Sequence, residues 1–388
     1  MPPAGTGRAG SGAGTVGTGA GGAAGGAAGA AGGAGSNLAG MGMGGAVAAA
    51  GMGGAGGMIA AGFGGIGVGG MGMGGAGGTL PPVTNSTMPD LKVAFTGDMA
   101  VRPGQSDEVL KLIKREGAHL ALHAGDMGYG DGPVAFENQL NSVLGDTYPY
   151  FYSVGNHDTG NQGWSTYQQN MQKRLDKIPE ASCTGDLGVR STCTYQGLMF
   201  ILSGVGTVGN TMAHNRYISN ELSKSDQLWE ICDWHKNHTD MQVGGKSTEV
   251  EAATYKACLD GGAIVATAHE HSYGRTFTLT NFRGRPYGKM GPPDMLTLSE
   301  GSTFVFHSGI GGSDIRVFRS HGNNSWWATI YTSDRFVMNG MRVNNFSANF
   351  GALFITFHVN GNPRSAEGYF KTISNDTIDR FTVTNMKP

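Results

Sequence analysis

The stretch Gly125-Asp126-Met127-Gly128-Tyr129 follows directly on the apolar run Ala118–His123. A short apolar run that ends at glycine is typical of a buried strand that leads into a turn. The turn here carries a carboxylate at Asp126 and a phenol at Tyr129. We therefore expect a strand whose carboxyl end presents two polar side chains.

Two other apolar runs end in the same way. Leu91–Phe95 leads to Asp98, and Tyr148–Val154 leads to Gly155-Asn156-His157-Asp158. Helical stretches over 107–116 and 134–144 separate the three runs, and alternation of strands with helices favours an α/β sheet. Polar residues just past the carboxyl ends of such strands gather into one site. We expect the three polar turns to meet.

The second half repeats this arrangement. The run 263–267 ends in Ala268-His269-Glu270-His271, and an apolar segment ends at Trp234-His235. The later runs alternate apolar and polar residues with few helix signals, and we expect them to be meander strands of a second sheet: 303–307, 352–359, 365–373 and 377–383. Two facing sheets with helices outside predict a four-layer α/β/β/α sandwich.

The N-terminal segment has a different composition. About half of the 69 glycines lie before residue 80, and Arg8 is the only charged residue before Asp90. Such a segment buries too little to offset its ordering entropy. We expect a disordered Gly/Ala/Met-rich spacer over 1–88 and a catalytic domain over 89–388. The uncharged stretch 46–73 has the length of a membrane span, but its glycine content favours a spacer.

Charge and cysteine usage bear on partners and location. The net charge of −2 without a Lys/Arg stripe gives no support for nucleic-acid binding. No signal peptide is visible in the sequence as given. The four cysteines suggest a loop-closing bridge between Cys183 and Cys193 and a second bridge between Cys232 and Cys258. The latter two could instead be buried thiols. Disulfides would favour an extracytoplasmic or secreted protein.

The polar turns resemble those of a known family. Asp98, Gly125-Asp126, Gly155-Asn156-His157-Asp158, His235 and His269-Glu270-His271 follow the order of the calcineurin-like metallophosphoesterases. The spacing Gly-Asp-x-x-Tyr resembles the purple acid phosphatase branch of that family. The resemblance covers about residues 91–385.

The resemblance implies two metal ions and assigns their ligands. A dinuclear hydrolytic site shares one carboxylate between the two cations, and Asp126 matches that position. The other protein ligands of the first ion would be Asp98, Tyr129 and His271, and those of the second would be Asn156, His235 and His269. His238 lies close to His235 in the sequence. We prefer His235 because it directly follows the apolar run.

Tyr129 would supply a metal ligand that the first turn lacks. Many members of the family have Asp-x-His there, whereas this chain has Asp98-Met99-Ala100. Tyr129 would replace the missing histidine ligand. Because an unperturbed tyrosine has a pKa of about 10, a phenolate ligand calls for a strongly acidic ion. The resemblance therefore implies Fe(III) at the first position and Zn, Mn or Fe(II) at the second.

The implied chemistry is attack of a metal-bound hydroxide on a phosphate ester. His157 matches a histidine that does not bind metal and protonates the leaving alkoxide. Asp158 stands where purple acid phosphatases usually have Glu. It could hold His157 protonated, or it could cap the following turn.

Three departures separate this chain from the pattern of the family, the last of them from its plant-type members. Ala268 and Ala100 replace glycines, and the histidine pair that follows the fourth motif is absent, since that region reads Val243-Gly244-Gly245-Lys246. Substrate contacts must therefore differ. Our candidates for them are His238, Lys246 and Arg275.

Three functions remain open at this point. The first is a phosphomonoesterase of acid-phosphatase type. The second is a phosphodiesterase acting on cyclic nucleotides or phospholipid head groups. The third is a surface-display protein whose catalytic domain is vestigial, although a complete ligand set argues against it.

Overall fold

The computed structural model describes residues 89–101, 105–160, 163–321, 324–343 and 347–388. The predicted spacer over 1–88 lies outside the described residues. The helices are α1 (Gln105–Arg115), α2 (Gly132–Val143), α3 (Gly163–Leu175), α4 (Thr211–Lys224) and α5 (Ala252–Asp260), with 3-10 turns η1 (Thr239–Met241) and η2 (Val359–Gly361).

The strands are short and fall mainly into two sheets. They are β1 (Leu91–Thr96), β2 (Leu120–Ala124), β3 (Tyr150–Ser153), β4 (Ala181–Asp186), β5 (Arg190–Tyr195), β6 (Leu198–Ser203), β7 (Trp229–Trp234), β8 (Ile264–Thr267), β9 (Tyr273–Thr276), β10 (Thr278–Leu279), β11 (Lys289–Met290), β12 (Met295–Leu298), β13 (Val305–Ser308), β14 (Trp327–Tyr331), β15 (Phe336–Met338), β16 (Met341–Arg342), β17 (Gly351–Phe357), β18 (Ser365–Thr372) and β19 (Thr377–Asn385).

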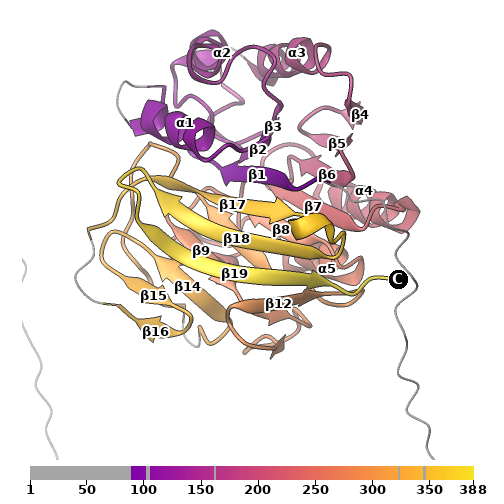
Figure 1. Ribbon diagram of the computed structural model, residues 1–388, viewed down its shortest axis with the longest axis vertical. Helices are drawn as coiled ribbons and strands as arrows, with labels where there is room; N and C mark the ends of the chain where they lie inside the picture. Colours follow the sequence, from indigo (N-terminus) through magenta and orange to yellow (C-terminus); the bar gives the residue numbers. More distant parts are fainter. Residues whose placement is uncertain (1–88, 102–104, 161–162, 322–323, 344–346) are drawn as a thin grey trace, which may run out of the picture. The chain divides into compact units, whose positions relative to one another are not determined.

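The two large sheets form the inner layers of a sandwich. One has seven strands in the order β12-β19-β18-β17-β1-β2-β3, and the other has ten in the order β16-β15-β14-β9-β13-β8-β7-β6-β5-β4. Helices α1 and α3 contact strands of the first sheet, and α4 and α5 contact strands of the second (Figure 1). The predicted α/β/β/α sandwich is therefore confirmed.

The sheets meet through aromatic side chains. Phe95 of β1 packs edge-on against Phe306 of β13, with ring centroids 5.1 Å apart. Phe151 of β3 packs in the same way on Phe200 of β6 at 4.6 Å. Such pairs stabilise beyond the burial of their area. This contact fixes the relative position of the strand ends that carry the polar turns.

One part of the strand assignment was wrong. We expected the last three strands in the second sheet, but β17 pairs antiparallel with β1 and so joins the first sheet. Figure 1 shows β17, β18 and β19 beside β1, although they lie at opposite ends of the described chain. The alternating pattern identifies a strand with one buried face, but it does not say which neighbour the strand pairs with.

Both predicted disulfides form. Cys183 of β4 lies directly opposite Cys193 of β5 and is bonded to it. Cys232 of β7 is bonded to Cys258 of α5. The second bridge ties the strand that precedes His235 to the helix that covers it.

Candidate metal centre

Five parallel strands deliver the predicted site residues. Asp98, Asp126 and Asn156 follow β1, β2 and β3 in one sheet, and His235 and His269 follow β7 and β8 in the other. The carboxyl ends of the strands in both sheets therefore face a common site, as the sequence predicts.

Three side chains form a first group. The Tyr129 hydroxyl donates a hydrogen bond to Asp98 Oδ1 over 2.7 Å. It also lies 2.8 Å from His271 Nε2, and that nitrogen is 3.2 Å from Asp98 Oδ1. The structure thus brings the three residues assigned to the first ion within hydrogen-bonding distance of one another.

A second group surrounds His235. Its Nε2 lies 3.2 Å from Asn156 Oδ1, 3.0 Å from His269 Nδ1 and 3.1 Å from Asp126 Oδ2. Donor atoms of Asp126, His235 and His269 all lie within 4.8 Å of one another. Carboxylate, imidazole and amide donors converging in a buried space fit a divalent or trivalent cation.

The outer nitrogen of each histidine has its own partner. His235 Nδ1 lies 2.8 Å from the carbonyl oxygen of Ala124, and His269 Nε2 lies 2.6 Å from Glu249 Oε2. His271 Nδ1 contacts the Asp314 carboxylate. Such contacts fix the tautomer and orientation of metal-binding imidazoles. Sequence reasoning missed Glu249 and Asp314, because neither belongs to a motif and both come close only through folding.

The pKa values of Asp98 and Tyr129 depend on the charged groups around them. Burial raises the pKa of Tyr129 far above its usual value, and the carboxylates of Asp98 and Asp126 raise it further. Burial would also raise the pKa of Asp98, but the nearby His271 and His235 outweigh it, so the pKa is lowered. A phenolate at Tyr129 therefore requires a neighbouring cation.

The backbone of the site adopts an uncommon conformation. Asp98, Asp126, Tyr129 and His269 have φ values of 55°, 58°, 42° and 66°. Left-handed backbone is tolerated by Asp but is unfavourable for larger side chains, and each such residue costs about 1–3 kcal/mol. Strain of this kind clusters where side chains must be aimed at a ligand.

His157 lies at the open side of the two groups. Its side chain is 51% exposed, and its Nε2 is 3.9 Å from Asp126 Oδ2. Its ring lies 4.6 Å, centroid to centroid, from the ring of Tyr129. A cavity of about 290 Å³ adjoins it, lined also by Gly130, Pro133 and Tyr167.

Asp158 has the contacts of a cap. Its Oδ2 accepts hydrogen bonds from the backbone N–H groups of Asp126 and Gly155, and its Oδ1 accepts one from Met127. These bonds join the turn after β2 to the turn after β3. Of the two roles that the sequence left open, the contacts favour capping over a partnership with the His157 ring.

Arg275 is not placed to contact a substrate, and that expectation was wrong. It is fully buried in β9 and forms an ion pair with Asp379, with distances of 2.6 and 2.9 Å. Tyr273 donates a further hydrogen bond to the same carboxylate. The strand pattern could not reveal this pairing with β19, which is far away in the sequence.

His238 also serves the fold. Its Nδ1 accepts the backbone N–H of Asp240 at the start of η1, over 3.1 Å. This contact is that of a helix cap, so we do not retain His238 as a substrate contact. Lys246, in contrast, is half-buried near the centre. Burial lowers its pKa, and the charge of Arg316 lowers it further, whereas Asp98 raises it.

The strand ends approach each other closely although position 268 is alanine and not glycine. A Cβ at Gly97 would lie 2.3 Å from the Cβ of Ala268. Because Gly97 has no side chain, the Ala268 methyl group fits beside it. A Cβ at Gly309 would lie 2.6 Å from Asp98 Oδ2, so this glycine is also required for close packing around the first group.

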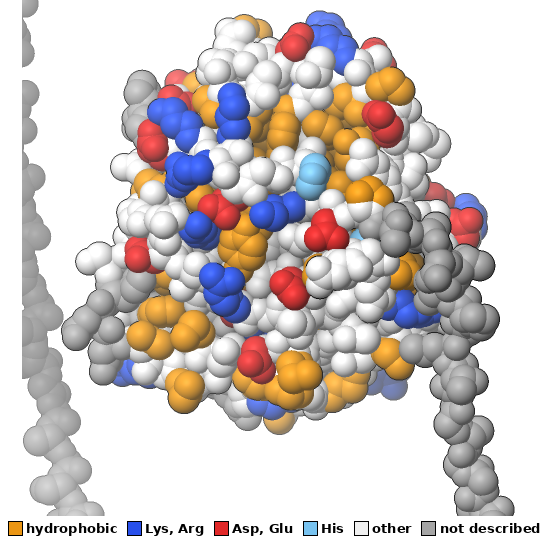
Figure 2. Space-filling view, viewed as in Figure 1, with side chains coloured by type: hydrophobic (Ala, Val, Ile, Leu, Met, Phe, Trp, Pro, Cys, Tyr) orange, Lys and Arg blue, Asp and Glu red, His pale blue; other side chains and the backbone are white. Residues whose placement is uncertain are grey.

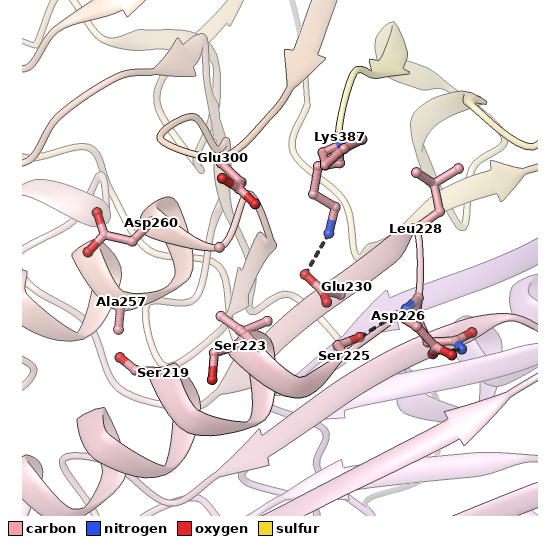
Figure 3. A pocket seen from close by; sticks show the side chains of 14 residues that line it. Ser219, Ser223, Ser225, Asp226, Leu228, Glu230, Ala257, Asp260, Glu300 and Lys387 are labelled. Atoms are coloured by element: carbon pink, nitrogen blue, oxygen red, sulfur yellow. Dashed lines mark hydrogen bonds and ion pairs between the residues drawn. The ribbon is translucent and has the colours of Figure 1, made fainter. Parts of the chain in front are cut away.

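A larger cavity lies elsewhere. It measures about 540 Å³ and is lined by residues of α4, α5 and the C-terminal segment, with Lys387 directed at Glu230 (Figure 3). The Lys387 ammonium lies 2.6 Å from Glu230 Oε2, so these buried charges satisfy each other. None of the predicted site residues lines this cavity.

The surface carries no single-sign patch on the face that Figure 2 shows, where acidic and basic side chains are intermixed. Among the described helices, none combines the length and the apolarity needed to cross a bilayer.

The comparison with one known structure supports the fold. The purple acid phosphatase PPD1 from yellow lupin (Lupinus luteus) seeds is 16% identical with a TM-score of 0.55, and the match covers 76% of this chain and 54% of the lupin chain. This chain thus spans about half the length of the lupin protein. GAP50, the anchor in the inner membrane complex of Plasmodium, is 13% identical with a TM-score of 0.47, covering 77% and 90% of the two chains.

A dimetal phosphatase from Danio rerio is 8% identical with a TM-score of 0.41, covering 76% of this chain and 99% of the other. The comparison with curated protein sequences finds no match. The model of the calcineurin-like phosphoesterase family matches residues 91–273, which contain every residue that we assign to the two ions. Residues 91–273 of this chain are therefore similar to the calcineurin-like phosphoesterases.

Proposed function

We propose that the chain is a dinuclear-metal phosphomonoesterase of the purple acid phosphatase type. The observation that carries the proposal is the position of Tyr129, whose hydroxyl lies within 2.8 Å of both Asp98 and His271. A phenol held between a carboxylate and an imidazole has the donor set of a ferric site with a tyrosinate ligand. Position 100 is alanine where many members of the family have a histidine ligand, and Tyr129 would replace that ligand.

Two ions would occupy the two groups of donors. Asp98, Asp126, Tyr129 and His271 would hold Fe(III), and Asp126, Asn156, His235 and His269 would hold Zn, Mn or Fe(II). When bound, the ions would neutralise the phosphoryl oxygens and lower the pKa of a water molecule, which turns it into a nucleophile at moderate pH.

The chain's own residues complete the reaction. His157 stands at the open side of the centre, where Nε2 of its half-exposed side chain can give a proton to the leaving oxygen of the ester. Asp158 fixes the backbone of the turns that carry Asp126 and His157. The backbone N–H of His157 in turn donates to Asp126 Oδ1 over 2.9 Å, which orients that carboxylate.

The two disulfides support an oxidising location. Cys183–Cys193 and Cys232–Cys258 are both closed, and such bridges persist mainly outside the cytosol. We propose that the protein works in an extracytoplasmic or secreted setting, with residues 1–88 as a spacer.

One experiment tests the proposed function. The purified protein is assayed with aryl phosphate monoesters and diesters, and its metal content and visible spectrum are measured on the same sample. We expect turnover of monoesters, about one iron per chain at the first position and a broad visible absorption band. Preferential turnover of diesters would move the proposal to a phosphodiesterase. Two bound ions without turnover of any ester would instead favour a vestigial centre.

A further inference from the structure

The hairpin of β4 and β5 has an exposed stem and a buried turn. Residues 184–186, which end β4, are exposed, whereas the turn residues Leu187, Gly188 and Val189 are buried. A connecting turn usually faces solvent, because its backbone groups need hydrogen-bond partners. The turn 187–189 instead lies inside the protein, so its backbone groups must find their partners there.

One partner of this turn is the end of β3. The carbonyl oxygen of Gly188 accepts the backbone N–H of Val154 over 3.0 Å. Val154 is the first residue after β3 and stands two positions before Asn156. The turn is thereby bonded to the start of the segment that leads from β3 to α3, which carries Asn156 and His157.

The other partner is α3, which begins where that segment ends. The carbonyl oxygen of Leu187 accepts hydrogen bonds from Trp164 Nε1 over 3.2 Å and from Gln168 Nε2 over 2.9 Å. Gln168 Nε2 also donates to Asp186 Oδ1 over 2.7 Å. One hairpin turn therefore holds both ends of the segment between β3 and α3.

The contact at Gly188 leaves no room for a side chain. A Cβ there would lie 2.4 Å from Cζ2 of Trp164 and 2.7 Å from the carbonyl oxygen of Tyr152 in β3. The backbone φ of Gly188 is 74°, which residues with a side chain rarely adopt. Because the turn is packed this closely, a displacement of the turn would act on β3 and α3 together.

The Cys183–Cys193 bridge reinforces this hairpin. β4 is the last strand of its sheet and pairs only with β5. A strand with one neighbour opens more readily than an inner strand, because fewer contacts hold it. The bridge joins directly opposite residues of the two strands and closes the chain around the turn. It therefore limits the positions that the turn can take.

We propose that the Cys183–Cys193 bridge positions Asn156 and His157 for the reaction, acting through the turn 187–189. This inference rests on the proposed function, in which Asn156 binds the second ion and His157 donates a proton. Both residues lie on a segment that is neither helix nor strand, so its ends must be anchored to keep their side chains in place. An error of about 1 Å in such a position can lower turnover about 100-fold.

Hydrogen exchange measures the segment directly. Exchange of peptides that cover residues 150–158 is followed in the metal-saturated wild type, in the double variant Cys183→Ser/Cys193→Ser and in Gly188→Ala. We expect exchange about tenfold faster in both variants, as for the loss of one hydrogen bond. The control is Ile378→Ala, which weakens the buried core at β19, on the other side of the first sheet. Unchanged exchange in the double variant, or an equal rise in the control, would overturn the proposal.

Metal affinity tests the effect on Asn156. Competition with a chelator should show the second ion bound about tenfold more weakly in the double variant. The first ion should be bound as in the wild type, because Asn156 is assigned only to the second. Equal weakening of both ions would point to a general loosening of the fold and would contradict the proposal.

Reduction of the wild type provides the same test without a substitution. A dithiol breaks the bridge by thiol–disulfide exchange and itself becomes a cyclic disulfide, so the protein gains two thiols. Cys183 is half-buried, whereas Cys232 and Cys258 are fully buried, so the dithiol reaches the hairpin bridge first. The affinity for the second ion should fall as in the double variant and return on reoxidation. An unchanged affinity after reduction of this bridge would refute the proposal.

Turnover tests the effect on His157. With both ions saturating, kcat on a phosphate monoester should fall about tenfold in the double variant, because the proton donor is held less accurately. The same two substitutions in a His157→Ala background should cost much less, since the donor is already absent. An equal loss in both backgrounds would exclude action through His157.

These measurements separate this inference from the proposed function. If the wild type hydrolyses no phosphate ester, the proposed function fails, whereas faster exchange and weaker binding of the second ion would still support the positioning role. A bridge that serves stability alone would lower the midpoint of thermal unfolding in the double variant. It would leave exchange, metal affinity and kcat unchanged well below that midpoint, and this result would overturn the inference.

Discussion

Tyr129 donates a hydrogen bond to Asp98 over 2.7 Å and so joins the turn after β2 to the turn after β1. The same hydroxyl lies 2.8 Å from His271, which comes from the other sheet. One phenol therefore links three strand ends. Its backbone φ of 42° is unfavourable for an aromatic residue, so the surrounding fold must hold it in place.

Replacement of Tyr129 by Phe should remove a ligand of the first ion while preserving the fold. The ring contact with His157 does not involve the hydroxyl and would remain. We expect the affinity for the first ion to fall at least about tenfold and the visible band to vanish. Metal analysis and the visible spectrum check this. Retention of iron together with the band would show that the phenol is not a ligand.

Replacement of Glu249 by Gln should weaken metal binding through His269. The carboxylate fixes the imidazole by its contact with Nε2, and loss of such a partner typically lowers affinity about 10–100-fold. Asp314→Asn should have a smaller effect, because Asp314 is 57% exposed and Glu249 only 25%. Competition with a chelator measures both. Glu251→Gln, at an exposed position near Glu249, is the matched control, and an equal change there would refute the orienting role.

Replacement of His157 by Ala should lower kcat by about 10²–10⁴-fold, since the leaving oxygen would lose its proton donor. Because the side chain is half-exposed and stands outside both groups of ligands, the protein should keep its fold and both ions. Kinetics and metal analysis on one preparation check this. Loss of an ion in the variant would reassign His157 as a ligand.

Replacement of Arg275 by Met should destabilise the protein by about 3–5 kcal/mol without changing KM. The variant leaves the buried Asp379 without its cation, but it touches no residue of the metal centre. Chemical denaturation and steady-state kinetics measure the two effects. Adding Asp379→Leu to the variant should restore part of the stability. A raised KM in folded protein would return Arg275 to the substrate contacts.

His123 should make the protein sensitive to acid. Burial lowers the pKa of His123 to about 4, whereas the unfolded chain binds the proton near 6.5. The stability contributed by the neutral ring is fully present above pH 6.5 and is lost as the pH falls from there to about 4. The loss amounts to roughly 3 kcal/mol at 1.36 kcal/mol per pH unit.

Unfolding of the chelator-treated protein between pH 7 and pH 4 tests this prediction, since removal of ions excludes their own pH dependence. His123→Gln should show a shallower loss of the free energy of unfolding over this range. The ring of His123 bonds Tyr150 and the carbonyl of Gly125, which an amide side chain can replace in part. Parallel curves for the two proteins would rule out His123 as the source.

The sequence by itself determined the strand ends and what they carry. Asp98, Asp126, Asn156, His235 and His269 each follow an apolar run, and that pattern is local, so it can be seen without the fold. The layered α/β architecture was predicted for the same reason. The Cys183–Cys193 bridge was predicted from the cysteine count and spacing, whereas Cys232 and Cys258 were left open between a bridge and buried thiols. Tyr129 was assigned as a ligand from the resemblance of Gly-Asp-x-x-Tyr to the purple acid phosphatases, and this assignment stays a prediction. Its hydroxyl lies within hydrogen-bonding distance of Asp98 and His271.

Only the tertiary structure decided which side chains serve the site and which serve the core. Arg275 and Arg316 look alike in the sequence, but β19 buries the first against Asp379 and the loop after β13 leaves the second beside His271. The pairing of β17 with β1 likewise joins distant segments. Strand neighbours and charge partners depend on contacts between residues far apart in the chain, and no local pattern contains that information.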